Sequence, residues 1–220
     1  MIDIFGLKLH GYGLLIGLGV LVAWEVAQRY GKIKEEVIDK LVVGLVLSGI
    51  AGARMYHVID FWEYYSKDLI KIFYVWNGGL GIWGGIIGGF IYIIYFAKKN
   101  NTNIWNISDS VTLGLPLAQA IGRVGNFVNG ELYGKNGEPL FAWEGGLNIF
   151  LFIILFVLNK KTYNKGLVTG FYLIGYGVIR ILLENFRPNE IIWRIGGVPT
   201  AIWMSFFSIA VGVKLIYDRK

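Results

Sequence analysis

Arg123, Asn126 and Glu131 lie close together in the run GRVGNFVNGELYG, residues 122–134. This run follows a hydrophobic segment, and an arginine at the centre of a membrane helix costs about 2.5–3.5 kcal/mol on insertion scales. Polar groups that are kept at such a position indicate a ligand or an ion-pair partner. The run is therefore the first candidate site.

Arg180 and Glu184 form a second pair, four residues apart at the end of another hydrophobic segment. Residues at this spacing share one helical face, as do Arg123 and Asn126. A guanidinium stays charged, and its planar fork of donors matches phosphate oxygens better than an ammonium does. Arg123 and Arg180 are therefore suited to a phospholipid phosphate. Asn126 and Glu184 could orient the guanidinium groups or contact the lipid glycerol.

Arg54 and His57 have a similar spacing in a third segment. Arg54 either contacts the ligand or braces the bundle by pairing with Glu131 or Glu144, and the sequence leaves both interpretations open. His57 is either a catalytic group or a packed or interfacial residue.

The composition predicts where these residues lie. Hydrophobic residues make up 55% of the 220 and charged residues only 16%, which is more apolar surface than one soluble core needs. Runs around 79–97, 146–158 and 200–217 approach the roughly 20 residues that cross a bilayer. We predict an all-α polytopic membrane protein rather than a soluble helical domain. The chain contains no cysteine, so any thiol must come from a substrate.

Hydrophobic runs divide the chain into seven expected membrane segments within a single integral-membrane domain, residues 1–220. Lysine and arginine concentrate in alternate loops, which places the N-terminus outside and the C-terminus in the cytoplasm. This topology accounts for the net charge of +6 better than nucleic-acid binding does. The N-terminal residues lack the features of a removable signal peptide, so the first segment is expected to stay. The segments are 11–29, 37–58, 79–97, 105–127, 142–158, 167–185 and 198–217.

Two further stretches have structural interpretations. Residues 61–76 mix aromatic and charged side chains and are too polar to span, so we expect an interfacial arm on the outer surface. In residues 81–90, one row of glycines recurs every four residues, beside a second row formed by Gly84 and Gly88. Such rows let neighbouring helices approach closely.

The predicted topology gathers nine polar residues near the outer ends of their helices. A cluster of this kind is typical of a binding site open to the outer leaflet, although single residues of the set could be ordinary helix-end anchors. The nine are Tyr12, Arg54, His57, Asn77, Arg123, Asn126, Glu144, Arg180 and Glu184.

The run 122–134 resembles the signature of the prolipoprotein diacylglyceryl transferase family. Eight specified positions within so short a run are far more specific than a lone glycine motif. HGYGLL at 10–15, GARMYHVI at 52–59, NGGLGIWGGIIGG at 77–89, PLFAWE at 139–144 and RILLENFRP at 180–188 resemble other family segments in the same order. The matching signature positions are Gly122, Arg123, Gly125, Asn126, Phe127, Asn129, Glu131 and Gly134.

This resemblance implies a bacterial inner-membrane transferase whose site faces the outer leaflet. Members move a diacylglyceryl group from phosphatidylglycerol to the lipobox cysteine of a prolipoprotein, forming a thioether and releasing glycerol phosphate. No metal or organic cofactor is implied. Arg123 and Arg180 are expected on the phosphate, where they stabilise the leaving group. The expected substrate-binding residues are Tyr12, Arg54, Asn126, Asn129, Gly134, Glu144 and Glu184.

The sequence departs from the family pattern at two places. Trp83 stands where a histidine, a candidate general base, is usual, and Ala201 and Ile202 replace an expected glycine-glutamine pair. A free thiol is only a few per cent ionised near neutral pH. We therefore expect arginine charge to lower the thiol pKa, and either His10 or Glu131 to accept the proton.

Two other classes of function remain open. A paralogue that lost catalysis with the histidine would bind phosphatidylglycerol but release no glycerol phosphate. A small transporter is disfavoured, because the sequence shows no pair of repeats with interrupted helices and its polar residues gather on one side rather than at the midplane.

Overall fold

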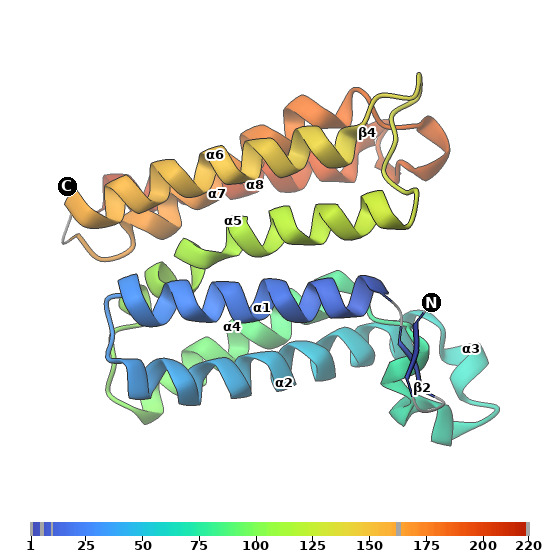
Figure 1. Ribbon diagram of the computed structural model, residues 1–220, viewed down its shortest axis with the longest axis horizontal. Helices are drawn as coiled ribbons and strands as arrows, with labels where there is room; N and C mark the ends of the chain where they lie inside the picture. The colour runs from blue at the N-terminus through green and yellow to red at the C-terminus, as the bar shows by residue number, and fades with distance from the viewer. Residues whose placement is uncertain (1, 5–6, 10, 162–163, 219–220) are drawn as a thin grey trace. The chain divides into compact units, whose positions relative to one another are not determined.

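The computed structural model describes residues 2–4, 7–9, 11–161 and 164–218 (Figure 1). These residues form eight α-helices, three short 3-10 helices and two small antiparallel hairpins, which confirms the all-α prediction. The helices are α1 (Gly11–Tyr30), α2 (Glu35–Asp60), α3 (Trp62–Tyr65), α4 (Ile82–Lys99), α5 (Ile104–Val128), α6 (Leu140–Lys161), α7 (Leu167–Glu184) and α8 (Thr200–Tyr217).

The remaining elements are short. Strand β1 (Ile2–Ile4) pairs with β2 (Leu7–Leu9), and β3 (Arg194–Ile195) pairs with β4 (Val198–Pro199). The 3-10 helices are η1 (Leu69–Phe73), η2 (Val75–Asn77) and η3 (Asn189–Ile191).

Each of the seven predicted segments coincides with one long helix. Three of these helices, α6, α7 and α8, are long and apolar enough to cross a membrane. By contact pattern the chain divides into two compact units, residues 1–32 with 108–220, and residues 33–107. We describe each unit by itself.

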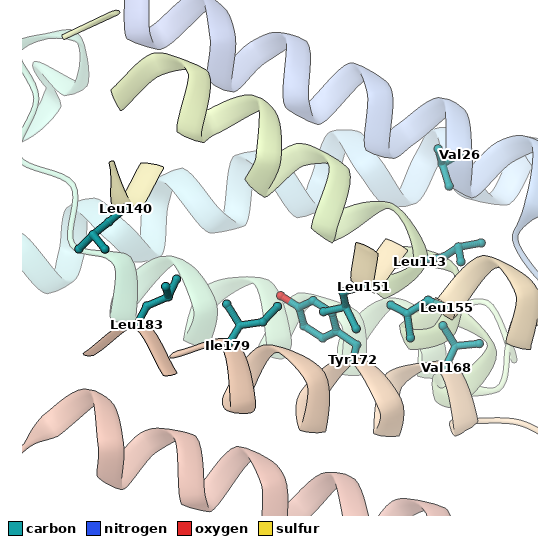
Figure 2. Packing of buried hydrophobic residues seen from close by; sticks show 9 residues of the cluster. All are labelled: Val26, Leu113, Leu140, Leu151, Leu155, Val168, Tyr172, Ile179 and Leu183. Atoms are coloured by element: carbon teal, nitrogen blue, oxygen red, sulfur yellow. The ribbon is translucent and has the colours of Figure 1, made fainter. Parts of the chain in front are cut away.

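In the first unit, α7 packs against both α6 and α8. Helix α1 approaches α5 closely at Gly114, where a methyl group would lie 2.7 Å from the Ala23 carbonyl oxygen. The apolar core lies among these helices and includes Leu113, Leu155 and Val168, each fully buried (Figure 2). This core holds α5, α6 and α7 together.

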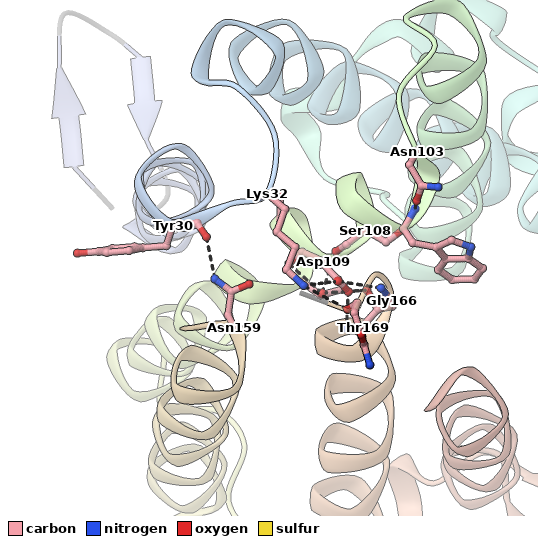
Figure 3. Close-up of polar contacts among 12 residues, drawn as sticks. Tyr30, Lys32, Asn103, Ser108, Asp109, Asn159, Gly166 and Thr169 are labelled. Atoms are coloured by element: carbon pink, nitrogen blue, oxygen red, sulfur yellow. Dashed lines mark hydrogen bonds and ion pairs between the residues drawn. The ribbon is translucent and has the colours of Figure 1, made fainter. Parts of the chain in front are cut away.

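The beginning of α7 is fixed by a buried carboxylate from α5 (Figure 3). Asp109 is fully buried and accepts hydrogen bonds from the backbone N–H groups of Gly166 (2.8 Å) and Thr169 (2.9 Å). It also pairs with the Lys32 ammonium at 3.0 Å. The free N–H groups at a helix start need acceptors. Asp109 thus caps α7 from a neighbouring helix and sets the position of α7 against α5.

In the second unit, α2 and α4 pack through glycine. A methyl group on Gly84 would lie 2.1 Å from the Gly52 carbonyl oxygen, and one on Gly88 would lie 2.4 Å from that of Ser48. On Gly85, in the other row, it would have 3.5 Å to its nearest neighbour. The prediction of close helix approach is confirmed, and Gly84 and Gly88 make the closest contacts with the backbone of α2.

Residues 61–76 fold as α3, η1 and the start of η2. Their large apolar side chains are widely exposed, including Trp62, Ile70, Phe73 and Trp76. The predicted position of this arm at a membrane surface stays a prediction.

Candidate anion-binding site

Three helix ends of the first unit bring two of the predicted arginines onto one buried carboxylate. Glu144, near the start of α6, is 1% exposed. Its Oε1 lies 2.9 Å from Nη2 of Arg123 on α5, and its Oε2 lies 3.8 Å from Nη1 of Arg180 on α7. The two guanidinium groups belong to segments far apart in the sequence, and their charges converge at Glu144.

A second buried carboxylate extends this cluster. Glu184, at the end of α7, is 3% exposed and lies 3.2 Å from Nη2 of Arg180. Its Oε2 also lies 3.4 Å from Nη1 of Arg187, which follows the helix. Sequence reasoning did not select Arg187. Its spacing of three residues from Glu184 was the available signal, because residues three apart meet on a helix.

The signature residues form a chain of hydrogen bonds that leads out of the cluster. Arg123 Nη1 donates to Asn126 Oδ1 at 2.8 Å, and Asn126 Nδ2 donates to Glu131 Oε2 at 3.2 Å. Asn129 Nδ2 donates to the other oxygen of Glu131 at 3.4 Å. Glu131 is exposed, whereas Asn126 is buried. Asn126 therefore orients the Arg123 guanidinium, and the exposed Glu131 carboxylate fixes Asn126.

The cluster is formally balanced, because its three arginines pair with Glu144 and Glu184, and Glu131 bonds to Asn126 beside them. The arginines keep capacity for a ligand: their side chains are 19–24% exposed. Among the described residues, the Nε atoms of Arg123 and Arg187 are buried without a hydrogen-bond partner. The carboxylates contact Nη atoms of the arginines, so an anion that binds those atoms must compete with a carboxylate.

Gly134 shapes the loop between α5 and α6. A methyl group at this residue would lie 2.2 Å from Glu138 Oε2 and 3.0 Å from the Phe186 carbonyl oxygen, so glycine lets the loop pack closely against the end of α7. The side chain and backbone N–H of Asn136 donate to Glu138, and these bonds hold the pKa of the Glu138 carboxyl below its usual value. The Lys135 N–H donates to the Phe186 carbonyl at 2.8 Å and ties the loop to the chain just after α7.

Arg54 has different partners from those considered in the sequence. It is 6% exposed, and five hydrogen bonds use all its guanidinium N–H groups on backbone carbonyls of residues 71–79. Within the described second unit, Arg54 therefore has no carboxylate partner, and its guanidinium has no N–H group left for a ligand. Arg54 holds a loop instead. The acceptors are the carbonyls of Lys71, Ile72, Tyr74, Gly78 and Gly79.

The same loop borders a cavity of about 350 Å³ in the second unit, lined by residues that include Arg54, His57 and Asn77. The His57 ring packs against Phe61, with ring centroids 4.5 Å apart, and edge-on against Tyr65 at 5.9 Å. These contacts favour the packed interpretation of His57.

The other predicted positions are only partly placed. Tyr12 belongs to α1, and Trp83 lies in the first turn of α4 with 37% of its surface exposed. His10 lies outside the described residues. Within the described ranges, no group of three or more histidine, aspartate and glutamate side chains could hold a metal ion.

Comparison with known proteins gives full-length matches. The model of a family described as "Prolipoprotein diacylglyceryl transferase" matches residues 1–217. A protein of Finegoldia magna named phosphatidylglycerol–prolipoprotein diacylglyceryl transferase is 36% identical, over 97% of this chain and 92% of its own length. A protein of the same name from Streptococcus pneumoniae is 32% identical, over 96% of this chain and 89% of its own length.

Proposed function

This chain belongs to the prolipoprotein diacylglyceryl transferase family, and from that premise we propose that it transfers a diacylglyceryl group from phosphatidylglycerol to the lipobox cysteine of a prolipoprotein. The observation that carries the proposal is the meeting of Arg123 and Arg180 at Glu144. It brings two permanent cations from different helices to one point, as a phosphate leaving group requires.

The reaction forms one bond and breaks one. The cysteine sulfur attacks the glyceryl carbon that carries the phosphate, and a thioether forms. The bond between that carbon and the phosphate oxygen breaks, and its electron pair leaves with glycerol phosphate. The thiol proton passes to a base. The chain has no cysteine of its own, so the sulfur belongs to the substrate.

Arg123 and Arg180 hold the phosphate and stabilise the charge that grows on it as the carbon–oxygen bond breaks. Before the lipid arrives, Glu144 and Glu184 balance these guanidinium groups. This pairing keeps both arginines in position. Arg187 supplies a third cation on the same side. Asn126 and Glu131 position Arg123, Asn129 bonds to Glu131, and Gly134 lets the loop between α5 and α6 approach Phe186.

The proton acceptor is either Glu131 or His10. Glu131 is supported by its position, because it is exposed and its carboxylate is joined through Asn126 to Arg123. If Glu131→Gln and His10→Ala each keep the full transfer rate at every pH tested, neither residue is the base.

The membrane arrangement is part of the proposal. Seven helices cross the bacterial inner membrane with the N-terminus outside, the site opens to the outer leaflet, and residues 61–76 lie at the interface. The coincidence of the seven predicted segments with long helices supports this arrangement.

Since the chain lacks cysteine, single cysteine substitutions give a clean topology test. Lys135→Cys, in the loop before α6, should react with an impermeant maleimide on intact cells. Lys99→Cys, at the end of α4, should react only after lysis. The reverse pattern would overturn the orientation.

The test of the activity is mass spectrometry of a lipobox peptide incubated with the purified protein and phosphatidylglycerol. We expect a diacylglyceryl mass gain and released glycerol phosphate. Arg123→Ala should abolish both, whereas Arg29→Ala should not, because Arg29 is an exposed residue paired with Glu25 at the far end of α1. Lipid binding without product would instead identify a catalytically silent paralogue, the alternative that Trp83 raises.

A further inference from the structure

Two uncharged polar side chains, one buried and one half-buried, lie one helical turn below the arginine cluster. Gln119 precedes Arg123 by four residues on α5, and Asn148 follows Glu144 by four residues on α6. At a rise of about 1.5 Å per residue, each lies about 6 Å from the cluster, toward the middle of its helix. Both amides therefore sit at one depth, inside the hydrophobic part of the unit.

These amides lack the partners that buried polar groups normally have. Asn148 is 0% exposed, and among the described residues neither of its amide atoms has a hydrogen-bond partner. Gln119 Nε2 donates to the Tyr172 hydroxyl at 3.0 Å, whereas the buried Gln119 Oε1 has no partner in the same part of the chain. Because nearly all buried amides are hydrogen-bonded, the unused Asn148 N–H donors at this depth indicate a missing hydrogen-bond acceptor.

The three side chains belong to helices that meet at the same place. The ion pair of Arg123 with Glu144 joins α5 to α6, and the hydrogen bond of Gln119 with Tyr172 joins α5 to α7. Asn148 shares the helical face of Glu144. In Figure 2 the Tyr172 hydroxyl is directed along α7 toward Ile179, the residue before Arg180. The polar groups therefore continue the arginine site inward.

We propose that Asn148 and Tyr172 bind the ester carbonyl oxygens of the phospholipid substrate, with Gln119 orienting the Tyr172 hydroxyl, an inference that rests on the proposed function. In a glycerophospholipid the ester carbonyls lie deeper in the bilayer than the phosphate. With the phosphate at the arginines, the carbonyls reach the depth of the two amides. The Tyr172 O–H and the Asn148 N–H groups are donors, and an ester carbonyl is an acceptor.

This arrangement makes the ester linkage a specificity determinant. A diether analogue of phosphatidylglycerol keeps the phosphate and the carbon–oxygen bond that breaks, but it has no carbonyl oxygens. Binding it would leave the buried donors without partners. The loss of even one net hydrogen bond of ordinary strength corresponds to about fivefold in affinity.

The test measures kcat/KM for the diester and the diether lipid with the same lipobox peptide. We expect the wild-type protein to prefer the diester by at least about fivefold, mainly through KM. Equal use of the two lipids would overturn the inference and leave the proposed function intact. Failure of the wild-type protein to use even the diester would overturn the proposed function, and the inference with it.

Two variants locate the preference. Asn148→Leu and Tyr172→Phe should each bring the ratio of diester to diether toward one. Asn159→Leu is the matched control on α6, because the Asn159 amide donates to the Tyr30 carbonyl and should keep the wild-type ratio. If the first two variants lower both rates equally and keep the ratio, their role is structural or bridged by water, and the inference is wrong. If either variant fails to fold, the wild-type ratio and the other variant still decide.

Discussion

Glu144→Gln tests whether the buried carboxylate holds the two arginines in place. Glu144 is 1% exposed, and its oxygens lie 2.9 Å and 3.8 Å from the guanidinium groups of Arg123 and Arg180. At an effective dielectric constant of about 20, each attraction amounts to roughly 4–6 kcal/mol before desolvation. Glutamine keeps the shape but removes the charge, so the two cations are left facing each other.

Removing one partner of a buried pair typically costs about 3–5 kcal/mol. We expect the lower end, about 3 kcal/mol, because Arg123 keeps Asn126 and Arg180 keeps Glu184. For a chain of this size that loss lowers the melting temperature by roughly 6–12 °C. The measurement is thermal unfolding of the purified protein in one detergent.

Glu131→Gln is the matched control within the same cluster. Glu131 is exposed and bonded to amides rather than cations, so its substitution should cost less than about 1 kcal/mol. Adding Arg123→Met to Glu144→Gln should cost less than the sum of the two single changes, because the residues are in contact. If Glu144→Gln unfolds within about 1 kcal/mol of the parent protein, the carboxylate does not hold the arginines and this reasoning fails.

Three further changes test the framework around the site. Asp109→Asn should lower the free energy of unfolding by about 3 kcal/mol, because it weakens the cap of α7 and breaks a buried ion pair. An unchanged free energy of unfolding in a denaturant titration would contradict that role. Gly84→Ala should destabilise the second unit, whereas Gly85→Ala should not. Hydrogen exchange of the α4 backbone amides measures the difference. Equal protection of these amides in the two variants would refute the close packing. Arg54→Lys should speed proteolysis within residues 71–79, since an ammonium has only three donors; an unchanged cleavage rate would mean that the loop holds itself.

The helices were predictable because hydrophobic length is a local property of the sequence. The predicted segments fall on long helices. In an apolar environment a helix satisfies all backbone N–H and C=O groups within one segment. The signature at 122–134 likewise located the arginine site, because its residues are close in sequence and Asn126 and Glu131 bond directly.

The partners of the arginines were not predictable, because they depend on which helix faces which. Arg123 was expected on a phosphate and lies against Glu144, which is 21 positions further along the chain. Arg54 was expected on a ligand or a carboxylate and instead meets backbone carbonyls, which no sequence pattern marks. The two glycine rows looked equivalent, and only the packing of α2 singles out Gly84 and Gly88.

Arg54 holds residues 71–79 through their backbone carbonyls, and this affects which positions of the loop can vary in evolution. Every residue type contributes the same carbonyl group, so the five acceptors persist whatever side chains stand at Lys71, Ile72 or Tyr74. Side chains at these three positions can therefore change while the shape of the loop is kept. Position 54 has no such freedom, because no other side chain offers five N–H donors in a fixed fork.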